Sequence, residues 1–487
     1  MQRDKLLNFN FEKTEKGVFI SNDFGNWMIL EPSEFDLVKN GKFDKKPSLA
    51  RKLKKKGFFS THLDFGKAVS AVKDLNPPGE NGPSLHIFVL TLKCNHRCVY
   101  CRALGADFKN TDMNEETARK CVDMALSSPN KNITIEFQGG ESLINWRTLK
   151  KTVDYALRKN RSLGKNLEIS VVTNFTLLDE RKFEFLNKNR ISVCTSLDGP
   201  REVHNRNRIY FGGSSYDITV NWLKRFADYS EKNRGRKDSL PSALMTTTKY
   251  SLDYPREIVD EYRALGLGGI FIRPLSPVGY AKQVFSRIGY RAEDFVFFYK
   301  RALDYCLKIN SRGEKFIERT AAIILQKMLF GRDPNYLDLR SPCGAAIGQI
   351  AYNWNGDVYT CDEGRMVGAR RDFSFRLGNV RDHSYADVVA SAPSKLCVIT
   401  SCLENQPECF RCAFKPFCGV CPVHNYEEQK TPWGNLRNSY WCGVQKGIFK
   451  VLTERLQDRK NRKIFESWFE STGGEGIAER RKSREKF

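Results

Sequence analysis

The sequence predicts an α/β protein built around a partial, TIM-like (β/α)6 barrel, with a small α+β domain before it and a cysteine-rich domain after it. Six apolar, β-rich runs alternate with helical stretches from Leu85 onward, as in folds with a parallel sheet. Polar and glycine-containing motifs follow several of these runs, where the carboxyl ends of barrel strands carry chemistry. Nine of the fifteen cysteines lie between Cys343 and Cys442, which sets the last part of the chain apart.

The elements are expected in the following order. Residues 1–75 contain strand-like runs at Gly17–Ile20 and Asn26–Leu30 and a helix start at Pro32, so they form a small domain. The expected barrel strands are His86–Leu92, Asn132–Phe137, Leu167–Val172, Ile191–Leu197, Ala243–Thr248 and Gly269–Arg273. The predicted divisions of the chain are an N-terminal domain (1–75), a proline- and glycine-rich linker (76–84), the barrel (85–300), connecting helices (301–342), the cysteine domain (343–445) and a basic terminal helix and tail (446–487).

The bulk composition narrows the functional classes only partly. The 487 residues carry a formal net charge of +23, which favours anionic partners or reflects solubility alone. The N-terminus lacks an apolar signal segment, and the longest apolar stretch, near Ala321–Phe330, is too short to span a membrane. We therefore expect a cytoplasmic protein with no membrane and no nucleic-acid partner. In that compartment its cysteines are expected to bind metal and not to form disulfides.

A first group of cysteines follows the first expected barrel strand. Cys94, Cys98 and Cys101 form a C-x3-C-x2-C loop, whose three thiolates can hold three irons of a [4Fe–4S] cluster. The fourth iron could then bind the amino and carboxylate groups of S-adenosylmethionine (SAM), and an electron from the cluster would produce a 5′-deoxyadenosyl radical. Zinc is the alternative, but it needs a fourth ligand, and His96 inside the loop is badly placed.

This loop resembles that of the radical SAM superfamily. The segment Gln138-Gly139-Gly140-Glu141 is similar to the family's glycine–glycine–glutamate motif, with Ser142 where the family usually has proline. Paired glycines let a backbone approach a ligand closely, and a carboxylate suits the SAM ammonium group. The resemblance implies that Arg208 pairs with the SAM carboxylate. The SAM-binding residues that it implies are Tyr100, Gly139, Gly140, Glu141, Asn174, Ser196, Asp198 and Arg208.

The downstream cysteines resemble the SPASM extension of peptide- and protein-modifying radical enzymes. That resemblance implies two auxiliary clusters, and so three [4Fe–4S] clusters in all. The first auxiliary cluster would be held by Cys343, Cys361 and Cys421, and the second by Cys409, Cys412, Cys418 and Cys442. The spacing Cys418-x2-Cys421 is one residue shorter than usual. The fourth ligand of the first cluster is left open: it could be Cys397 or Cys402, or that iron could have no protein ligand. Zinc bound by the paired C-x2-C elements is the alternative to iron–sulfur clusters.

Asp362 follows Cys361 and resembles an acid that serves as a general base in some members of the family. A solvated aspartate in a turn is the alternative interpretation.

The subfamily that the chain most resembles is the maturases of His-Xaa-Ser peptide systems. This resemblance implies an oxidoreductase that modifies side chains of a ribosomally made precursor peptide, by cross-linking, with residues 1–75 docking the precursor. It also implies a low-potential electron donor of the flavodoxin or ferredoxin type. The alternatives are an anaerobic sulfatase-maturating type enzyme that forms formylglycine, and an iron–sulfur electron-transfer or scaffold protein. The sequence leaves the modified residues, the redox partner and the oligomeric state open.

Overall fold

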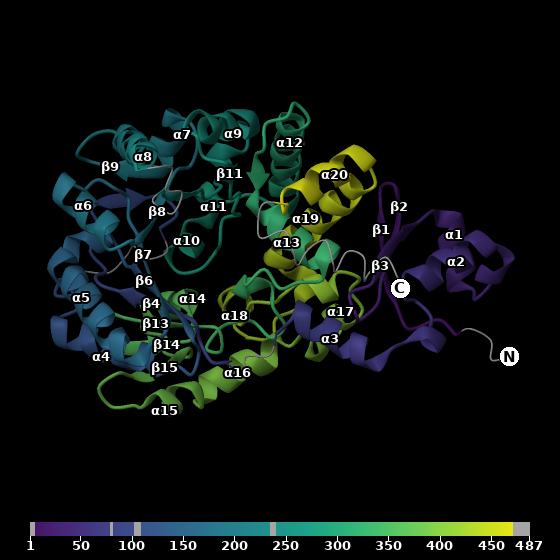
Figure 1. The fold of residues 1–487 in the computed structure, drawn as a ribbon, viewed down its shortest axis with the longest axis horizontal. Helices are drawn as coiled ribbons and strands as arrows, with labels where there is room; N and C mark the ends of the chain where they lie inside the picture. Colours follow the sequence, from purple (N-terminus) through teal and green to yellow (C-terminus); the bar gives the residue numbers. More distant parts are fainter. Residues whose placement is uncertain (1–4, 78–80, 102–108, 234–239, 471–487) are drawn as a thin grey trace.

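A computed structural model describes residues 5–77, 81–101, 109–233 and 240–470 of the chain. In Figure 1 the N-terminal domain lies at one end of the molecule and the parallel sheet with its helices at the other. The C-terminal helices lie between the two. The predicted tail, from residue 473 onward, falls outside the described residues.

The N-terminal domain is a three-stranded antiparallel sheet covered by two helices. The strands β1 (Asn10–Thr14), β2 (Gly17–Ser21) and β3 (Trp27–Leu30) pair in that order, so both strands predicted from the sequence are confirmed. The helix α1 (Pro32–Lys39) begins at the predicted proline, and α2 (Pro47–Lys55) follows it. Side chains from these elements form a hydrophobic core of their own, which includes Val18, Ile20, Leu30, Phe35, Leu49 and Leu53.

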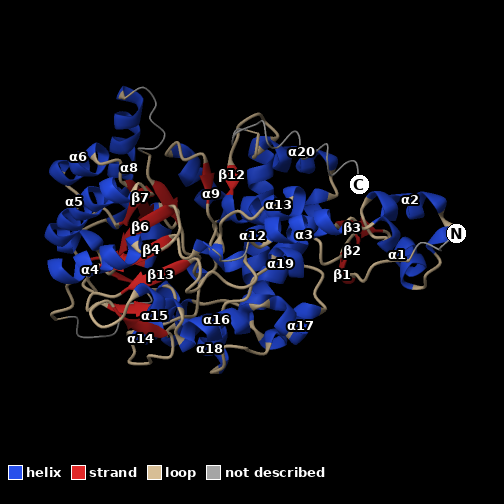
Figure 2. Ribbon diagram, turned by 60° about the horizontal axis from the view of Figure 1, so that its bottom comes forward, coloured by secondary structure: helices blue, strands red, loops and turns tan. Residues whose placement is uncertain are grey.

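A mainly parallel sheet, with helices packed around it, forms the part of the molecule farthest from the N-terminal domain (Figure 2). Five of the six expected strands pair in parallel as β10-β8-β7-β6-β4, with bounds Ser242–Leu244, Ser192–Ser196, Asn166–Val172, Asn132–Gln138 and Leu85–Val89. In β6, Ile133, Ile135 and Phe137 are fully buried in the core, whereas Glu136 and Gln138 are half-buried on the opposite face. The helices that follow these strands are α4 (Glu115–Leu126), α5 (Trp146–Leu163), α6 (Glu180–Lys188), α7 (Arg201–Asn207), α8 (Ser215–Lys232) and α9 (Pro255–Ala264).

The sixth expected strand differs from the prediction. It is shortened to β11 (Gly269–Ile270), which pairs in parallel with β12 (Ile317–Glu318) outside the main sheet. At the edge of β4 the main sheet instead continues into β13 (Gln349–Tyr352), β14 (Asp357–Tyr359) and β15 (Arg376–Asn379). The parallel strands β4, β6, β7, β8 and β10 and the beginning of the cysteine domain therefore share one sheet, and the boundary predicted near residue 343 does not separate two sheets.

The predicted linker, residues 76–84, is hydrogen-bonded to the rest of the protein near both of its ends. The Asn76 side-chain oxygen accepts hydrogen bonds from Lys327 Nζ (3.0 Å) and from the Ser341 amide (3.2 Å), and the Pro83 carbonyl accepts one from Ser128 Oγ (2.7 Å). Leu75, at the end of α3 (Phe65–Leu75), is buried in the main core together with Phe19 of β2. The described parts of segment 76–84 are therefore hydrogen-bonded to the rest of the protein.

The predicted terminal helix is two helices. α19 (Tyr440–Leu456) and α20 (Arg459–Ser467) are separated at Asp458, whose carboxylate accepts hydrogen bonds from the first amides of α20 and caps it. The remaining described helices of four residues or more are α10 (Tyr280–Gln283), α11 (Phe285–Ile288), α12 (Ala292–Asn310), α13 (Arg319–Phe330), α14 (Asp362–Gly368), α15 (Tyr385–Val389), α16 (Ala392–Ser401), α17 (Pro407–Phe410) and α18 (Pro422–Gln429). Among the described helices, none is long and apolar enough to cross a membrane.

Candidate functional site

The cysteine loop lies beyond the carboxyl end of β4. Within it, the short strand β5 (His96–Cys98) pairs antiparallel with β9 (Arg208–Tyr210), and this register sets Cys98 opposite Arg208. Burial raises the pKa of the Cys94 and Cys98 thiols to about 12, and the neighbouring Cys101 thiol adds to both rises. The three thiols therefore form one group, which matches the donor set that holds three irons of a [4Fe–4S] cluster.

The two glycines of the glycine–glycine–glutamate motif pack against the base of this loop. The Gly140 and Glu141 amides donate hydrogen bonds to the carbonyls of Thr91 and Lys93, both at 2.8 Å. A Cβ atom on Gly140 would lie 2.0 Å from the Lys93 carbonyl oxygen, and one on Gly139 would lie 2.3 Å from that of Thr91. The close approach that requires glycine is thus to the backbone leading into Cys94, whereas the sequence suggested an approach to the ligand.

Glu141 connects the carboxyl end of β6 with that of β7 through hydrogen bonds. Its buried carboxylate accepts hydrogen bonds from Thr173 Oγ1 (2.7 Å), the Asn174 amide (2.8 Å) and the Leu143 amide (3.0 Å). Burial raises the pKa of Glu141, and these hydrogen bonds oppose the rise. Because a carboxylate offers about four acceptor positions, most of its capacity is used within the protein.

Asn174 connects the third strand end with the cysteine loop. Its side-chain nitrogen donates to Asn95 Oδ1 (3.0 Å) and lies 4.0 Å from Cys94 Sγ. Ser196, which ends β8, is half-buried. These two residues therefore lie at strand ends, as predicted.

Asp198, Arg208 and Tyr100 form a buried polar network. Arg208 donates from Nε to Asp198 Oδ2 (3.1 Å) and from Nη2 to Asp198 Oδ1 (3.3 Å), and the Tyr100 hydroxyl donates to Asp198 Oδ2 (2.7 Å). The Arg208 guanidinium also lies 5.2 Å from the centre of the Tyr100 ring. The sequence suggested a SAM carboxylate as the partner of Arg208, and the structure adds Asp198 as a partner within the protein.

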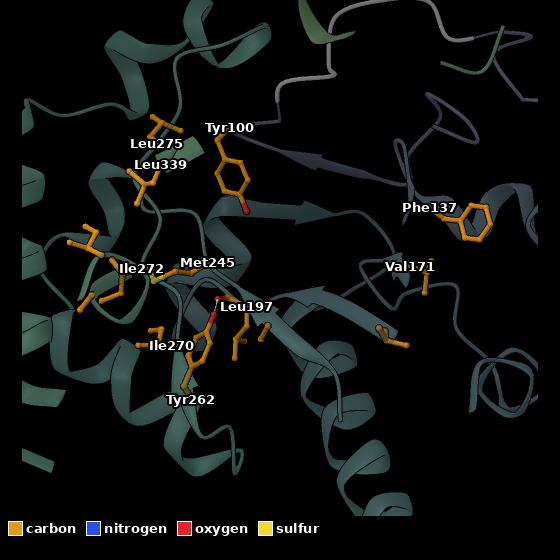
Figure 3. Close-up of a cluster of buried hydrophobic side chains, with 14 of the residues drawn as sticks. Tyr100, Phe137, Val171, Leu197, Met245, Tyr262, Ile270, Ile272, Leu275 and Leu339 are labelled. Carbon is orange, nitrogen blue, oxygen red and sulfur yellow. Dashed lines mark hydrogen bonds between the residues drawn. The ribbon is translucent and has the colours of Figure 1, made fainter. Parts of the chain in front are cut away.

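Tyr100 belongs to a cluster of buried side chains that also contains Leu197, Met245 and Tyr262 (Figure 3). The Tyr262 hydroxyl donates a hydrogen bond to the carbonyl of Leu197 (2.6 Å), between Ser196 and Asp198, and both Tyr262 and Met245 are fully buried. The strand end that carries Asp198 is therefore fixed by packing.

The first group of downstream cysteines lies in a buried apolar cluster. Cys343 and Cys361 pack there with Val367, Phe375 and Val423, and Cys421 packs against the cluster. Although the spacing from Cys418 to Cys421 is short, Cys421 thus lies beside Cys343 and Cys361, as predicted. Cys397 is fully buried in the same cluster.

The second group, Cys409, Cys412, Cys418 and Cys442, surrounds a small cavity beside the N-terminal domain. Burial raises the pKa of all four thiols, and the Lys446 ammonium opposes that rise at Cys409, Cys412 and Cys442. The Asn10 side chain of β1 donates to the carbonyls of Phe410 (3.0 Å) and Cys412 (3.4 Å). This group therefore lies at the contact between two domains.

The three groups fit clusters in composition and proximity. In the part of the chain that the structure describes, no three histidine, cysteine or acidic side chains converge tightly enough to hold a single metal ion. In a [4Fe–4S] cluster each thiolate binds its own iron, so its ligands surround a volume and do not converge on a point.

Two acidic residues, one on α14 beside Cys361 and one on β6, interact electrostatically. Asp362, the first residue of α14, is ion-paired with the buried Arg365, whose Nε and Nη2 donate to Asp362 Oδ1 at 3.0 and 2.7 Å. Sequence reasoning missed Glu136 on β6, whose carboxylate accepts from Gln138 Nε2 (2.6 Å) and Ser170 Oγ (3.2 Å). Burial raises the pKa of Glu136, and the negative charge of Asp362 adds to the rise. A glutamate at the centre of an apolar strand was the available signal.

Comparisons with known proteins agree with this arrangement. Residues 88–236 match the radical SAM superfamily, and residues 343–422 match the SPASM iron–sulfur cluster-binding domain. The chain is 26% identical over 376 residues to a cysteine-type anaerobic sulfatase-maturating enzyme of Clostridium perfringens, covering 74% of this chain and 94% of that protein. It is 29% identical over 391 residues to the radical SAM cyclopropyl synthase TigE of Paramaledivibacter caminithermalis, covering 76% and 73%.

The fold is similar to that of a solved structure, Streptococcus suis SuiB bound to its precursor peptide SuiA. The TM-score is 0.53 at 15% sequence identity, and the match covers 90% of this chain and 99% of SuiB. The first match contains Cys94, Cys98 and Cys101, and the second contains the downstream cysteines named above except Cys442, so the chain has the radical SAM domain and the C-terminal SPASM domain of a radical SAM/SPASM enzyme.

Proposed function

We propose that this protein is a peptide maturase that cleaves SAM reductively and cross-links side chains of a ribosomally made precursor peptide by oxidation. The observation that carries the proposal is the combination of a three-thiol loop with two further groups of cysteines, one of which contacts the N-terminal domain. The proposal includes three [4Fe–4S] clusters, a partial (β/α)6 barrel and a low-potential flavodoxin- or ferredoxin-type donor.

The relatives support a polypeptide substrate. The relatives named above include a sulfatase-maturating enzyme and a cyclopropyl synthase, and SuiB was solved with a bound precursor peptide. Residues 76–487 make up less than 90% of the chain, so the similarity to SuiB has to include part of the N-terminal domain. We infer that residues 1–75 dock the precursor, through pairing of an edge strand with an extended peptide.

When bound, the clusters supply one-electron chemistry that cleaves SAM to a 5′-deoxyadenosyl radical and accepts an electron from the oxidised substrate. The protein's own residues would position SAM through the Glu141 and Arg208 charges. A cross-link removes two hydrogens from the substrate, one as a hydrogen atom to the radical and the other as a proton to a base.

Asp362 and Glu136 are the two candidates for that base. Asp362 Oδ1 already accepts two hydrogen bonds from the Arg365 guanidinium, so part of the acceptor capacity of this carboxylate is used within the protein. The pKa of Glu136 is raised, so its carboxylate accepts a proton more readily. Glu136→Gln and Asp362→Asn therefore form a matched pair of variants that tests which carboxylate is the base. The variant that lacks the base should retain SAM cleavage but lose peptide modification.

Co-expression with the short open reading frames next to the gene, followed by mass spectrometry of the peptides, tests the function. We expect one peptide to lose two hydrogen atoms per modification, and only when the Cys94–Cys101 loop is intact. Uncoupled SAM cleavage with no modified peptide would contradict the maturase proposal.

The second candidate function is a sulfatase-maturating type enzyme, which the match over 94% of the Clostridium perfringens enzyme favours. A synthetic peptide carrying a sulfatase cysteine site separates the two functions. Replacement of the cysteine sulfur by an aldehyde oxygen would favour this second function.

A further inference from the structure

The fourth ligand of the first auxiliary cluster can be inferred from where α16 places its cysteine. The resemblance assigned only Cys343, Cys361 and Cys421 to this cluster, and it left two cysteines and an open iron as alternatives. Cys397 lies on α16, which belongs to neither cysteine motif, so spacing alone could not assign it.

Cys397 and Cys361 share a hydrogen-bonding partner. The Thr360 hydroxyl donates to Cys361 Sγ (3.7 Å) and also interacts with the Cys397 thiol. Both thiols are buried in one cluster with Cys343. The Cys397 side chain therefore points into the group of thiols.

The backbone of α16 is fastened to Cys343. Ser401 Oγ accepts a hydrogen bond from the Cys343 amide (2.9 Å) and donates one to the Cys397 carbonyl (2.6 Å). A single hydroxyl thus connects the two cysteines through their main chains, which fixes the helix in position beside Cys343.

Cys402 has different surroundings. It caps the end of α16, is half-buried, and donates its thiol hydrogen to Glu404 Oε2 (3.3 Å). The Cys402 thiol also interacts with the Ser341 side chain. It therefore serves as a matched control on the same helix.

We propose that Cys397 is the fourth protein ligand of the first auxiliary cluster, so that each iron there carries a thiolate and none is open to substrate. This inference rests on the proposed auxiliary clusters. It implies that the peptide is held by the protein and exchanges electrons with this cluster without binding to it.

The test uses full-length holoprotein carrying Cys94→Ala, Cys98→Ala and Cys101→Ala, so that only the auxiliary clusters contribute. Iron content and electron paramagnetic resonance (EPR) spectra are measured with and without cyanide, a small ligand for open iron. We expect this triple variant, the parent in the comparisons below, to hold about eight irons and to give the same EPR spectrum with and without cyanide. Adding Cys397→Ala should create a cyanide-sensitive iron or remove about four irons. Adding Cys402→Ala should change neither property.

A cyanide-sensitive parent, or a Cys397→Ala protein indistinguishable from the parent, would overturn the assignment, as would an effect of Cys402→Ala alone. A parent without iron would refute the auxiliary clusters themselves. Cys397→Ser, which retains a small polar side chain, checks that any loss is not caused by misfolding, because its circular dichroism and melting temperature should match those of the parent.

Discussion

The thiols of the Cys94–Cys101 loop and those of the first downstream cysteine group have different surroundings. The loop presents three half-buried thiols beside a charged network of Asp198 and Arg208. The downstream group places Cys343, Cys361 and Cys397 in a buried hydrophobic cluster with Cys421 at its edge, and the carboxylates of Asp338 and Glu363 raise the pKa of thiols there. The loop thiols therefore lie near a cation and the downstream thiols near anions. Under the proposed function, we expect a small molecule to reach the cluster at the loop, and not the downstream cluster, where the proposed Cys397 ligand leaves no open iron.

The largest effect is expected when the loop is removed. Replacing Cys94, Cys98 and Cys101 with alanine should abolish SAM cleavage and reduce the iron content from about twelve to about eight per chain. Iron analysis and detection of 5′-deoxyadenosine measure both. Cys121→Ala is the control, because this fully buried core cysteine belongs to none of the three groups and should retain full iron and cleavage. Residual SAM cleavage in the triple variant would contradict the assignment of SAM cleavage to this loop.

The charged network should respond strongly to loss of its cation. Arg208→Ala leaves the fully buried Asp198 unpaired, which should cost about 3–5 kcal/mol in unfolding free energy and weaken SAM binding. Arg208→Ala combined with Asp198→Asn should recover most of the stability, because no buried charge remains unpaired, but not the binding. Anaerobic thermal unfolding and SAM titration separate the two effects. Normal SAM binding in the double variant would show that Arg208 has only a structural role.

Glu141 provides a test through pH. The proposed role of Glu141 is to hold the SAM ammonium with its carboxylate. Because the pKa of Glu141 is raised above its usual value of 4.5, SAM affinity should then fall as the pH drops through that raised pKa. Stability should change in the opposite direction: the folded state binds the proton more tightly than the unfolded chain, so this contribution is present at low pH and is lost as the pH rises. Glu141→Gln should abolish the pH dependence of binding and reduce affinity roughly ten- to a hundredfold, one charge-assisted bond of about 1.5–3 kcal/mol. Calorimetric titration between mildly acidic and neutral pH measures this, and a pH-dependent Glu141→Gln protein would argue against the assignment.

The smallest effect concerns the contact between the N-terminal domain and the second cysteine group. Asn10→Ala removes the side-chain bonds to the carbonyls of Phe410 and Cys412, each worth about 0.5–1.5 kcal/mol. Hydrogen exchange should accelerate at residues 409–413 and stay unchanged around Cys343 and Cys361. Asn40→Ala, which loses only a local bond to Asp36, is the control. Point variants suit this test better than deletion of residues 1–75, because that deletion would also take Phe19 and Leu75 out of the main core.

Much of this arrangement could be predicted because local patterns determine it. Period-two apolar runs identified β6 and β7. Spacing identified the cysteine loop, and the resemblance to the SPASM extension implied the two downstream groups, which the fold does bring together. Features that depend on distant packing could not be predicted. Cys397 joins the first downstream group only because α16 packs beside Cys343, and the motif glycines are required by the carbonyls of Thr91 and Lys93. The pairing of β13 with β4 joins residues more than 250 positions apart, so no local pattern indicates it.

That pairing has a consequence for how the protein is made. β4 is the first strand of the main sheet to be synthesised, and β13 covers one of its two edges. Until residues 349–352 have left the ribosome, this edge carries unpaired amides and carbonyls and is open to wrong strand pairing. The SAM-binding half of the sheet therefore reaches its final form only after the first residues of the SPASM domain have been translated. Truncated chains that end before β13 should aggregate, and the protein should acquire its barrel cluster only late in its synthesis.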